Sequence, residues 1–125
     1  MFIYQILIEY DGTNFVGWQI QKNGHSIQEA IQKTLKKIFK QKITLYGSGR
    51  TDSGVHALEQ SAHFSLKKKI NNKLLLLNTL NFFLHKKKIS ILNIKERKKN
   101  FHARYSAKKR VYQYVIINRI APLTL

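Results

Sequence analysis

The residue types best suited to chemistry lie in one glycine-rich segment, 47–56, which reads GSGRTDSGVH. Its glycines allow a tight turn and a close approach of a ligand to the backbone. Asp52 is the only carboxylate of this segment, and contact with the Arg50 guanidinium would favour its ionised form. An ionised carboxylate in a loop between strands is suited to act as a nucleophile or base. The residues alone leave open an alternative, a hairpin in which Asp52 caps its own turn.

Two phosphate-binding motifs and a metal site are excluded by the spacing of the residues. A dinucleotide fingerprint counted from Gly47 and Gly49 requires glycine at the position of Asp52. A P-loop requires Lys and then Ser or Thr after Gly54, where the sequence continues with Val-His. The histidines show no metal-ligand spacing, and the chain has no cysteine. We therefore expect no metal site.

The other carboxylates have structural explanations. Glu29 lies three residues after Ser26, the spacing of a capping box in which the hydroxyl accepts from a backbone amide and the carboxylate reaches back. Asp11 precedes Gly12 in a turn, where aspartate is favoured for local hydrogen bonds. The remaining acidic residues fall within or beside expected strands: Glu9, Glu59 and Glu96. The glycine-rich segment therefore holds the carboxylate best placed for chemistry.

Tyrosines and cations are interleaved near the end of the sequence. The tyrosines are Tyr105, Tyr112 and Tyr114, and the cations are Arg104, Lys108, Lys109 and Arg110. Aromatic faces stack on exposed bases while cations hold phosphates, and stacking contributes about 1–3 kcal/mol per base. Tyr112 and Tyr114 would share one face of a strand, because side chains alternate. The alternative, given equal weight, is that both tyrosines pack on the core.

The chain is strongly basic, and its charge is unevenly distributed. Its 125 residues include 23 Lys and Arg against 6 Asp and Glu, a formal net charge of +17. Residues 1–62 carry 7 basic and 5 acidic side chains, whereas residues 63–125 carry 16 and 1. Such a positive region favours nucleic acid as a partner. A competing interpretation is AT-rich coding, since Lys, Ile and Asn make up 42 of the 125 residues.

The hydrophobic pattern predicts an α+β fold. Apolar residues recur at helical spacing from Ser26 to Phe39, and the run over 72–85, capped by Asn71 or Asn72, is long enough for a second helix. Strands are expected at 2–10, 42–46, 57–66, 88–95 and 109–118, with loops at 47–54 and 98–107. The order β-α-β-β-α-β, followed by a further strand, resembles a ferredoxin-like split β-α-β unit. Such a unit is a mainly antiparallel sheet with helices on one face.

The composition fits one α/β domain over residues 1–125. Hydrophobic residues make up 43% of the chain, enough for a core, and no apolar run approaches the ~18 residues needed to cross a bilayer. The apolar beginning of the sequence lacks the basic region and cleavage site of a signal peptide, so we interpret it as a strand. The absence of cysteine excludes thiolate chemistry and fits a reducing, cytoplasmic setting.

Four ordered segments resemble the TruA-type tRNA pseudouridine synthases. Residues 8–19 (IEYDGTNFVGWQ) are similar to the opening stretch of that family, and residues 49–57 (GRTDSGVHA) differ from its GRTDAGVHA motif only at Ser53. Residues 101–107 (FHARYSA) and 112–114 (YQY) are similar to two further motifs. The sequence departs from the family pattern after Asn78, where the usual Leu-Pro is absent.

The resemblance implies a reaction and a set of functional residues. The family isomerises uridine to pseudouridine at positions 38–40 of the tRNA anticodon stem-loop, without a cofactor, and its members are usually homodimers. The catalytic aspartate of the family falls on Asp52 and its accompanying arginine on Arg50. The tyrosine that stacks on the target base falls on Tyr112. We also expect three cations to bind the RNA: Arg104, Lys109 and Arg110.

A member of this family normally has a second, pseudo-symmetric half of similar length. Residues 1–125 resemble the N-terminal half, which implies that the C-terminal half is absent from this chain. Two functions therefore compete. One is a tRNA pseudouridine synthase, and the other is a truncated, catalytically inactive RNA-binding remnant.

Overall fold

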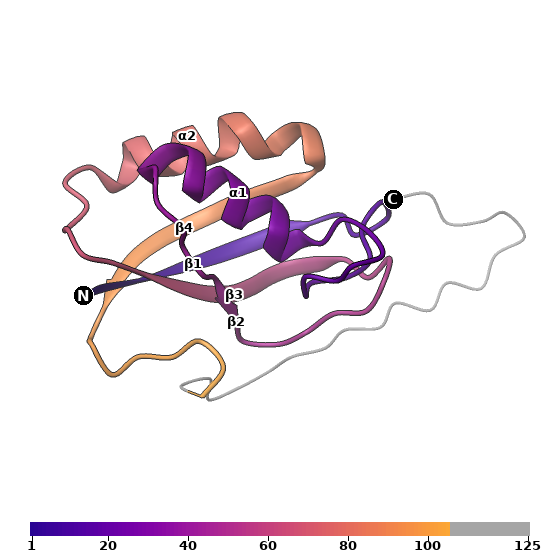
Figure 1. Ribbon diagram of the computed structural model, residues 1–125, viewed down its shortest axis with the longest axis horizontal. Coiled ribbons are helices and arrows are strands. Elements are labelled where there is room, and N and C mark those ends of the chain that lie inside the picture. Colours follow the sequence, from indigo (N-terminus) through magenta and orange to yellow (C-terminus); the bar gives the residue numbers. More distant parts are fainter. Residues whose placement is uncertain (106–125) are drawn as a thin grey trace, which may run out of the picture.

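The part of the chain that the structure describes forms an antiparallel sheet with two helices (Figure 1). The computed structural model describes residues 1–105. The elements are β1 (Phe2–Tyr10), α1 (Ile27–Phe39), β2 (Tyr46–Gly47), β3 (Ala57–Leu66), α2 (Lys73–Leu84), a 3-10 turn (His85–Lys87) and β4 (Ile89–Arg97). The strands pair antiparallel in the order β2-β3-β1-β4. This order confirms the predicted ferredoxin-like α+β fold.

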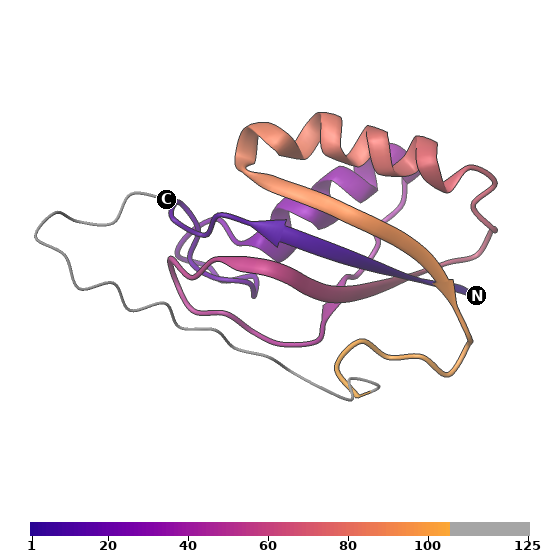
Figure 2. The ribbon, with the colours of Figure 1, turned by 180° about the vertical axis from the view of Figure 1, so that it is seen from behind.

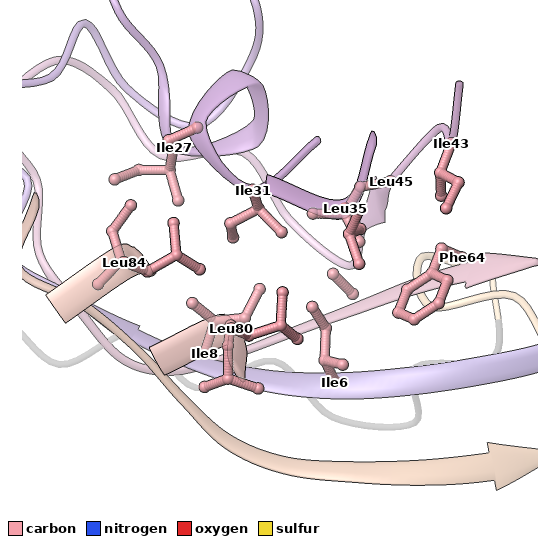
Figure 3. Packing of buried hydrophobic residues seen from close by; sticks show 14 of the residues in the cluster. Ile6, Ile8, Ile27, Ile31, Leu35, Ile43, Leu45, Phe64, Leu80 and Leu84 are labelled. Atoms are coloured by element: carbon pink, nitrogen blue, oxygen red, sulfur yellow. The ribbon is translucent and has the colours of Figure 1, made fainter. Parts of the chain in front are cut away.

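Both helices lie on the same face of the sheet, and the segment after β4 turns back on the opposite side (Figures 1 and 2). Alternation along β1 produces this division, because successive strand residues point to opposite faces. Tyr4, Ile6 and Ile8 are fully buried, whereas Glu9 is exposed. Figure 3 shows Ile6 and Ile8 packing below apolar side chains of the two helices. The core therefore lies between the sheet and the helices.

Helix α1 forms because an amphipathic sequence follows a capping residue. The Ser26 hydroxyl accepts a hydrogen bond from the Glu29 backbone amide at 3.1 Å, as predicted. The Glu29 carboxylate does not complete the box: it lies 3.3 Å from Nδ1 of His25 and 3.8 Å from Nζ of Lys33. The helix ends at Phe39, and the residue that caps it, Lys40, adopts a left-handed conformation with a φ of 55°.

Helix α2 begins where the sequence predicts, because the Asn72 side chain accepts a hydrogen bond from the Leu75 amide at 3.0 Å. It continues through the position at which the family's Leu-Pro is missing and ends at Leu84. Asn81 joins it to β4, since its side chain accepts from the Ile91 amide at 2.7 Å and donates to the Ile91 carbonyl at 3.0 Å. This pair of bonds fixes the helix against the edge strand.

The strand predicted at 42–46 is shorter than expected. Only Tyr46 and Gly47 pair with β3. The backbone of Leu45 bonds instead to α1: its amide donates to the Gln32 side chain at 2.9 Å, and its carbonyl accepts from Gln28 at 2.7 Å. The helix side chains thus take the place of a strand partner. The strand predicted at 109–118 lies outside the described residues.

Candidate active site

Two loops meet at one end of the sheet and form the base of the site. One loop follows β1 and the other precedes β3. The Trp18 amide donates to the Thr51 carbonyl at 3.1 Å, and the Gly54 amide donates to the Phe15 carbonyl at 3.2 Å. The Tyr10 hydroxyl lies 2.7 Å from the Thr51 hydroxyl. These bonds hold the glycine-rich segment against the end of the first strand.

Glycine is required at two points of contact between the loops. Gly17 has a φ of 110°, and a Cβ on it would lie 2.5 Å from the Thr51 carbonyl oxygen. A side chain on Gly12 would overlap the Val55 carbonyl. The similarity of residues 8–19 and 49–57 to one family therefore has a physical basis, because the backbones of the two segments are in contact.

Asp11 stabilises this junction, as its place in a turn predicted. Its carboxylate accepts from the amide and hydroxyl of Thr13, and these bonds lower the pKa of Asp11. Nδ1 of His56 lies 3.1 Å from the carboxylate and accepts the Gly12 amide at 2.9 Å. An Nδ1 that accepts the Gly12 amide carries no proton, so it gives the Asp11 carboxylate no hydrogen bond. His56 therefore links the two loops through the Gly12 amide, and Asp11 orders the turn through Thr13.

Asp52 stands at the tip of the second loop and is exposed. The turn is closed by its backbone, because the Asp52 carbonyl accepts from the Val55 amide at 3.1 Å. Within residues 1–105 its carboxylate has neither an ion pair nor a side-chain hydrogen bond. This geometry disfavours the alternative in which the Asp52 side chain caps its own turn, and leaves the side chain exposed to solvent.

Arg50 borders a cleft of about 440 Å³ beside this loop. Trp18, Tyr46 and Gly49 also line the cleft. No ion pair joins the Arg50 guanidinium to the Asp52 carboxylate within the described part of the chain, although only Thr51 separates the two residues. The two residues are therefore close along the loop, but only Arg50 lines the cleft. The volume is in the range of about 300–1,000 Å³ typical of ligand sites.

The segment after β4 forms the far wall of the cleft. His63 on β3 is 5% exposed, and its Nδ1 accepts the Ala103 amide at 2.9 Å. Burial lowers the pKa of His63 to about 4, with a further contribution from His102, so the ring is neutral near pH 7. This bond holds the segment against the face of the sheet that the helices do not cover. His102 and Arg104 reach the cleft by this route.

The structure brings together two of the residues that the sequence singled out, since Arg50 and Arg104 both line the cleft. Asp52 lies two residues beyond Arg50 along the loop and does not line the cleft. The other three lie outside the described residues: Tyr112, Lys109 and Arg110. The sequence analysis missed Tyr46 and His63, which face each other across β2 and β3. Alternation placed His63 on the face opposite Phe64, but no sequence signal showed that another segment would cover it.

The described residues offer neither a metal site nor a membrane-spanning helix. Residues 1–105 contain no group of three or more His, Cys, Asp or Glu side chains arranged to hold a metal ion. In the same part of the chain, neither helix is long and apolar enough to span a bilayer.

Comparison with known proteins gives one consistent family. Residues 6–106 match the family model described as tRNA pseudouridine synthase. The chain is 59% identical over its whole length to tRNA pseudouridine synthase A of Pelagibacter ubique, covering 51% of that protein. It is 48% identical to the Ehrlichia ruminantium protein of the same name over 98% of the chain and 50% of the relative. It is 46% identical to the Anaplasma marginale protein of the same name, over 95% of the chain and 49% of that relative.

The chain thus spans about half the length of the curated relatives that it matches. The family match covers both loops that build the site, together with the sheet and helices that position them. The resemblance carried by the sequence motifs is confirmed, and the chain belongs to the tRNA pseudouridine synthase family.

Proposed function

We propose that this chain carries the catalytic aspartate of a tRNA pseudouridine synthase that acts on the anticodon stem-loop, at positions 38–40. One observation carries the proposal: the loop junction presents the Asp52 carboxylate, without a partner in residues 1–105, beside a cleft lined by two arginines. Family membership supplies the reaction class. Cytoplasmic location and a homodimeric state belong to the same proposal.

The proposed reaction exchanges one glycosidic bond for another. The N1–C1′ bond of uridine breaks, the uracil rotates, and a C5–C1′ bond forms while the C5 proton is lost and N1 regains a proton. The target atoms are hidden in a stacked stem, so the nucleotide must be extruded before reaction. Asp52 acts as the nucleophile: its carboxylate bonds either to C6 of the base or to C1′ of the sugar, and this bond breaks again before the product leaves, which regenerates the carboxylate.

Arg50 is proposed to bind and orient the extruded nucleotide. Its guanidinium borders the cleft and carries a permanent charge, so it can hold a phosphate with two parallel hydrogen bonds. Three other residues complete the proposed RNA contacts: Arg104, Lys109 and Arg110. Tyr112 is proposed to stack on the target base, on the strength of the YQY motif.

The test measures release of tritium from uridine labelled at C5 in an anticodon stem-loop. Residues 1–125 are assayed alone and joined to the remaining half of the Pelagibacter ubique relative. Asp52→Asn should abolish release, by at least about 10³-fold, because the amide keeps the shape but lacks nucleophilicity. Glu59→Gln, an exposed carboxylate on β3, is the matched control and should retain activity.

The outcomes separate the two functions that the sequence left open. Release by the joined chain that depends on Asp52 supports the synthase. RNA binding without release in either form would identify a binding remnant and overturn the proposed catalysis. Near-normal release by Asp52→Asn would remove this aspartate from the mechanism.

A further inference from the structure

An aromatic surface lines part of the cleft. Tyr46 on β2 lies directly across from His63 on β3. Their rings stack with centroids 5.0 Å apart and an interplanar angle of 18°. Tyr46 nevertheless remains 48% exposed. A planar ring that stacks on one neighbour has its second face directed away from it, and Tyr46 borders the cleft.

A second exposed aromatic side chain comes from a different element. Tyr105 lies on the segment after β4 and is 78% exposed. The centroid of its ring lies 4.5 Å from that of the His102 ring, and the His102 centroid lies 5.5 Å from that of Tyr46. The two tyrosines are therefore joined through one imidazole. Both line the cleft, and the pairing of His63 with the Ala103 amide fixes the segment that carries Tyr105.

Charge decides what kind of molecule suits this surface. The cleft is lined by the guanidinium groups of Arg50 and Arg104, and no carboxylate contributes to its lining within residues 1–105. Exposed aromatic rings beside cations are the composition of a single-stranded nucleic acid site, where rings stack on bases and cations contact the backbone. Burial of the rings in a core does not explain exposures of 48% and 78%.

The position of Asp52 indicates which nucleotide the surface would take. Asp52 does not line the cleft, whereas Arg50 and Gly49 do. A uridine that reacts at the Asp52 carboxylate would therefore lie at the Arg50 border of the cleft, where the guanidinium can hold its phosphate. The part of the cleft lined by Tyr46 and Tyr105 is then left for a neighbouring nucleotide.

We propose that Tyr46 and Tyr105 form a stacking surface for an unpaired nucleobase adjacent to the target uridine. The proposal deepens the proposed function and depends on it for the identity of the RNA. Stacking reads no hydrogen-bond pattern, so this subsite tolerates different bases. It would allow one enzyme to accept several neighbouring target positions.

Binding of an anticodon stem-loop to the full 125-residue chain tests the proposal. Tyr46→Leu keeps apolar volume against His63 but removes the aromatic face. We expect a loss of affinity of about 5- to 150-fold, the range of one stacked base. Tyr46→Phe should bind within about threefold of the unmodified chain, because it keeps the ring. Phe82→Ala is the matched control, since Phe82 is 71% exposed on α2, over the opposite face of the sheet.

A double-mutant cycle separates stacking from a structural role of Tyr46. The RNA is prepared with an abasic site on either side of the target uridine, or in the opposite strand of the stem. If Tyr46 stacks on the neighbouring base, removing the base and the ring together should lower the RNA affinity no more than removing either one alone. The salt dependence of binding should keep its slope in Tyr46→Leu, because no phosphate contact is lost.

Each outcome decides the proposal. Two results together support the stacking surface. Of the three variants, only Tyr46→Leu loses RNA affinity, and its loss is non-additive with that of an abasic site next to the target uridine. Additive losses, or equal losses in Tyr46→Leu and Phe82→Ala, overturn it. Failure of the unmodified chain to bind the stem-loop also overturns it. Tritium release is measured in parallel, so that a working synthase without coupling at Tyr46 refutes only this inference, and coupling without release refutes only the catalysis.

Discussion

The two faces of the sheet are built from different interactions. Toward the helices, side chains such as Ile6, Leu35 and Leu80 are fully buried and purely apolar. On the other face the contacts are polar: Gln5 donates to the Ser61 hydroxyl at 2.7 Å, and His63 accepts from a backbone amide. Apolar packing has no direction, whereas each hydrogen bond requires one geometry. The helix-covered face therefore stabilises the fold, and the hydrogen bonds of the polar face position the segments that line the cleft.

The largest predicted effect tests the helix-covered face. Leu35→Ala should lower the free energy of unfolding by about 2–5 kcal/mol, because it removes a fully buried side chain and leaves a cavity. Urea denaturation measures the loss. The RNA affinity of the folded fraction should not change, since Leu35 lies away from the cleft. A change in that affinity would show that the two faces are coupled.

A pair of glycines tests the loop junction, with the next largest effect. Gly17→Ala should destabilise by about 1–3 kcal/mol through its positive φ and by more through the approach of Cβ to the Thr51 carbonyl. Gly54→Ala also has a positive φ, of 78°, but nothing lies within 4 Å of its Cβ. Gly17→Ala should therefore be the more destabilising in urea and lower tritium release as well. Equal effects would indicate that backbone conformation, not contact between the loops, requires glycine.

The sequence predicted the helix-covered face more fully than the polar face. The 3.6-residue spacing and the Ser26 cap located α1, and the length of the apolar run with a cap at Asn71 or Asn72 located α2, because these signals act within one element. The shortened β2 was not predictable, since Gln28 and Gln32 of a helix satisfy the Leu45 backbone from 13 to 17 residues away.

The candidate site shows the same limit. Asp52 and Arg50 were found because they stand in one glycine-rich segment. Tyr46 and His63 were missed because their role depends on a segment about 40 residues beyond His63 that folds back over the sheet. Local patterns reveal chemistry within a loop, but not the tertiary contact that completes a cleft.

A pH experiment tests the polar face, and its effect is smaller. The pKa of His63 is about 4 in the folded chain and about 6.5 in the unfolded chain, so the unfolded chain binds more protons between these values. The contribution of His63 to the free energy of unfolding should be fully present above pH 6.5. It should be lost as the pH decreases toward 4, which lowers the free energy of unfolding by about 1–3 kcal/mol. In His63→Gln this part of the pH dependence should vanish.

The smallest predicted effect compares two helix caps with the same chemistry. Ser26→Ala and Asn72→Ala each remove a side-chain acceptor from the first turn of a helix, and each should lower stability by about 1 kcal/mol. The caps differ in what lies beside them. The first amides of α1 donate to the loop of the site, Ile27 to the Gly17 carbonyl at 3.1 Å and Gln28 to the Trp18 carbonyl at 3.0 Å.

Loosening the start of α1 should therefore displace the loop that supports the glycine-rich segment, while loosening the start of α2 should not. We expect tritium release to fall severalfold in Ser26→Ala and to stay unchanged in Asn72→Ala, at equal losses in urea denaturation. The comparison is made at a temperature where both variants are fully folded. Equal activities would mean that the site is held by the two loops alone and that α1 serves only the core.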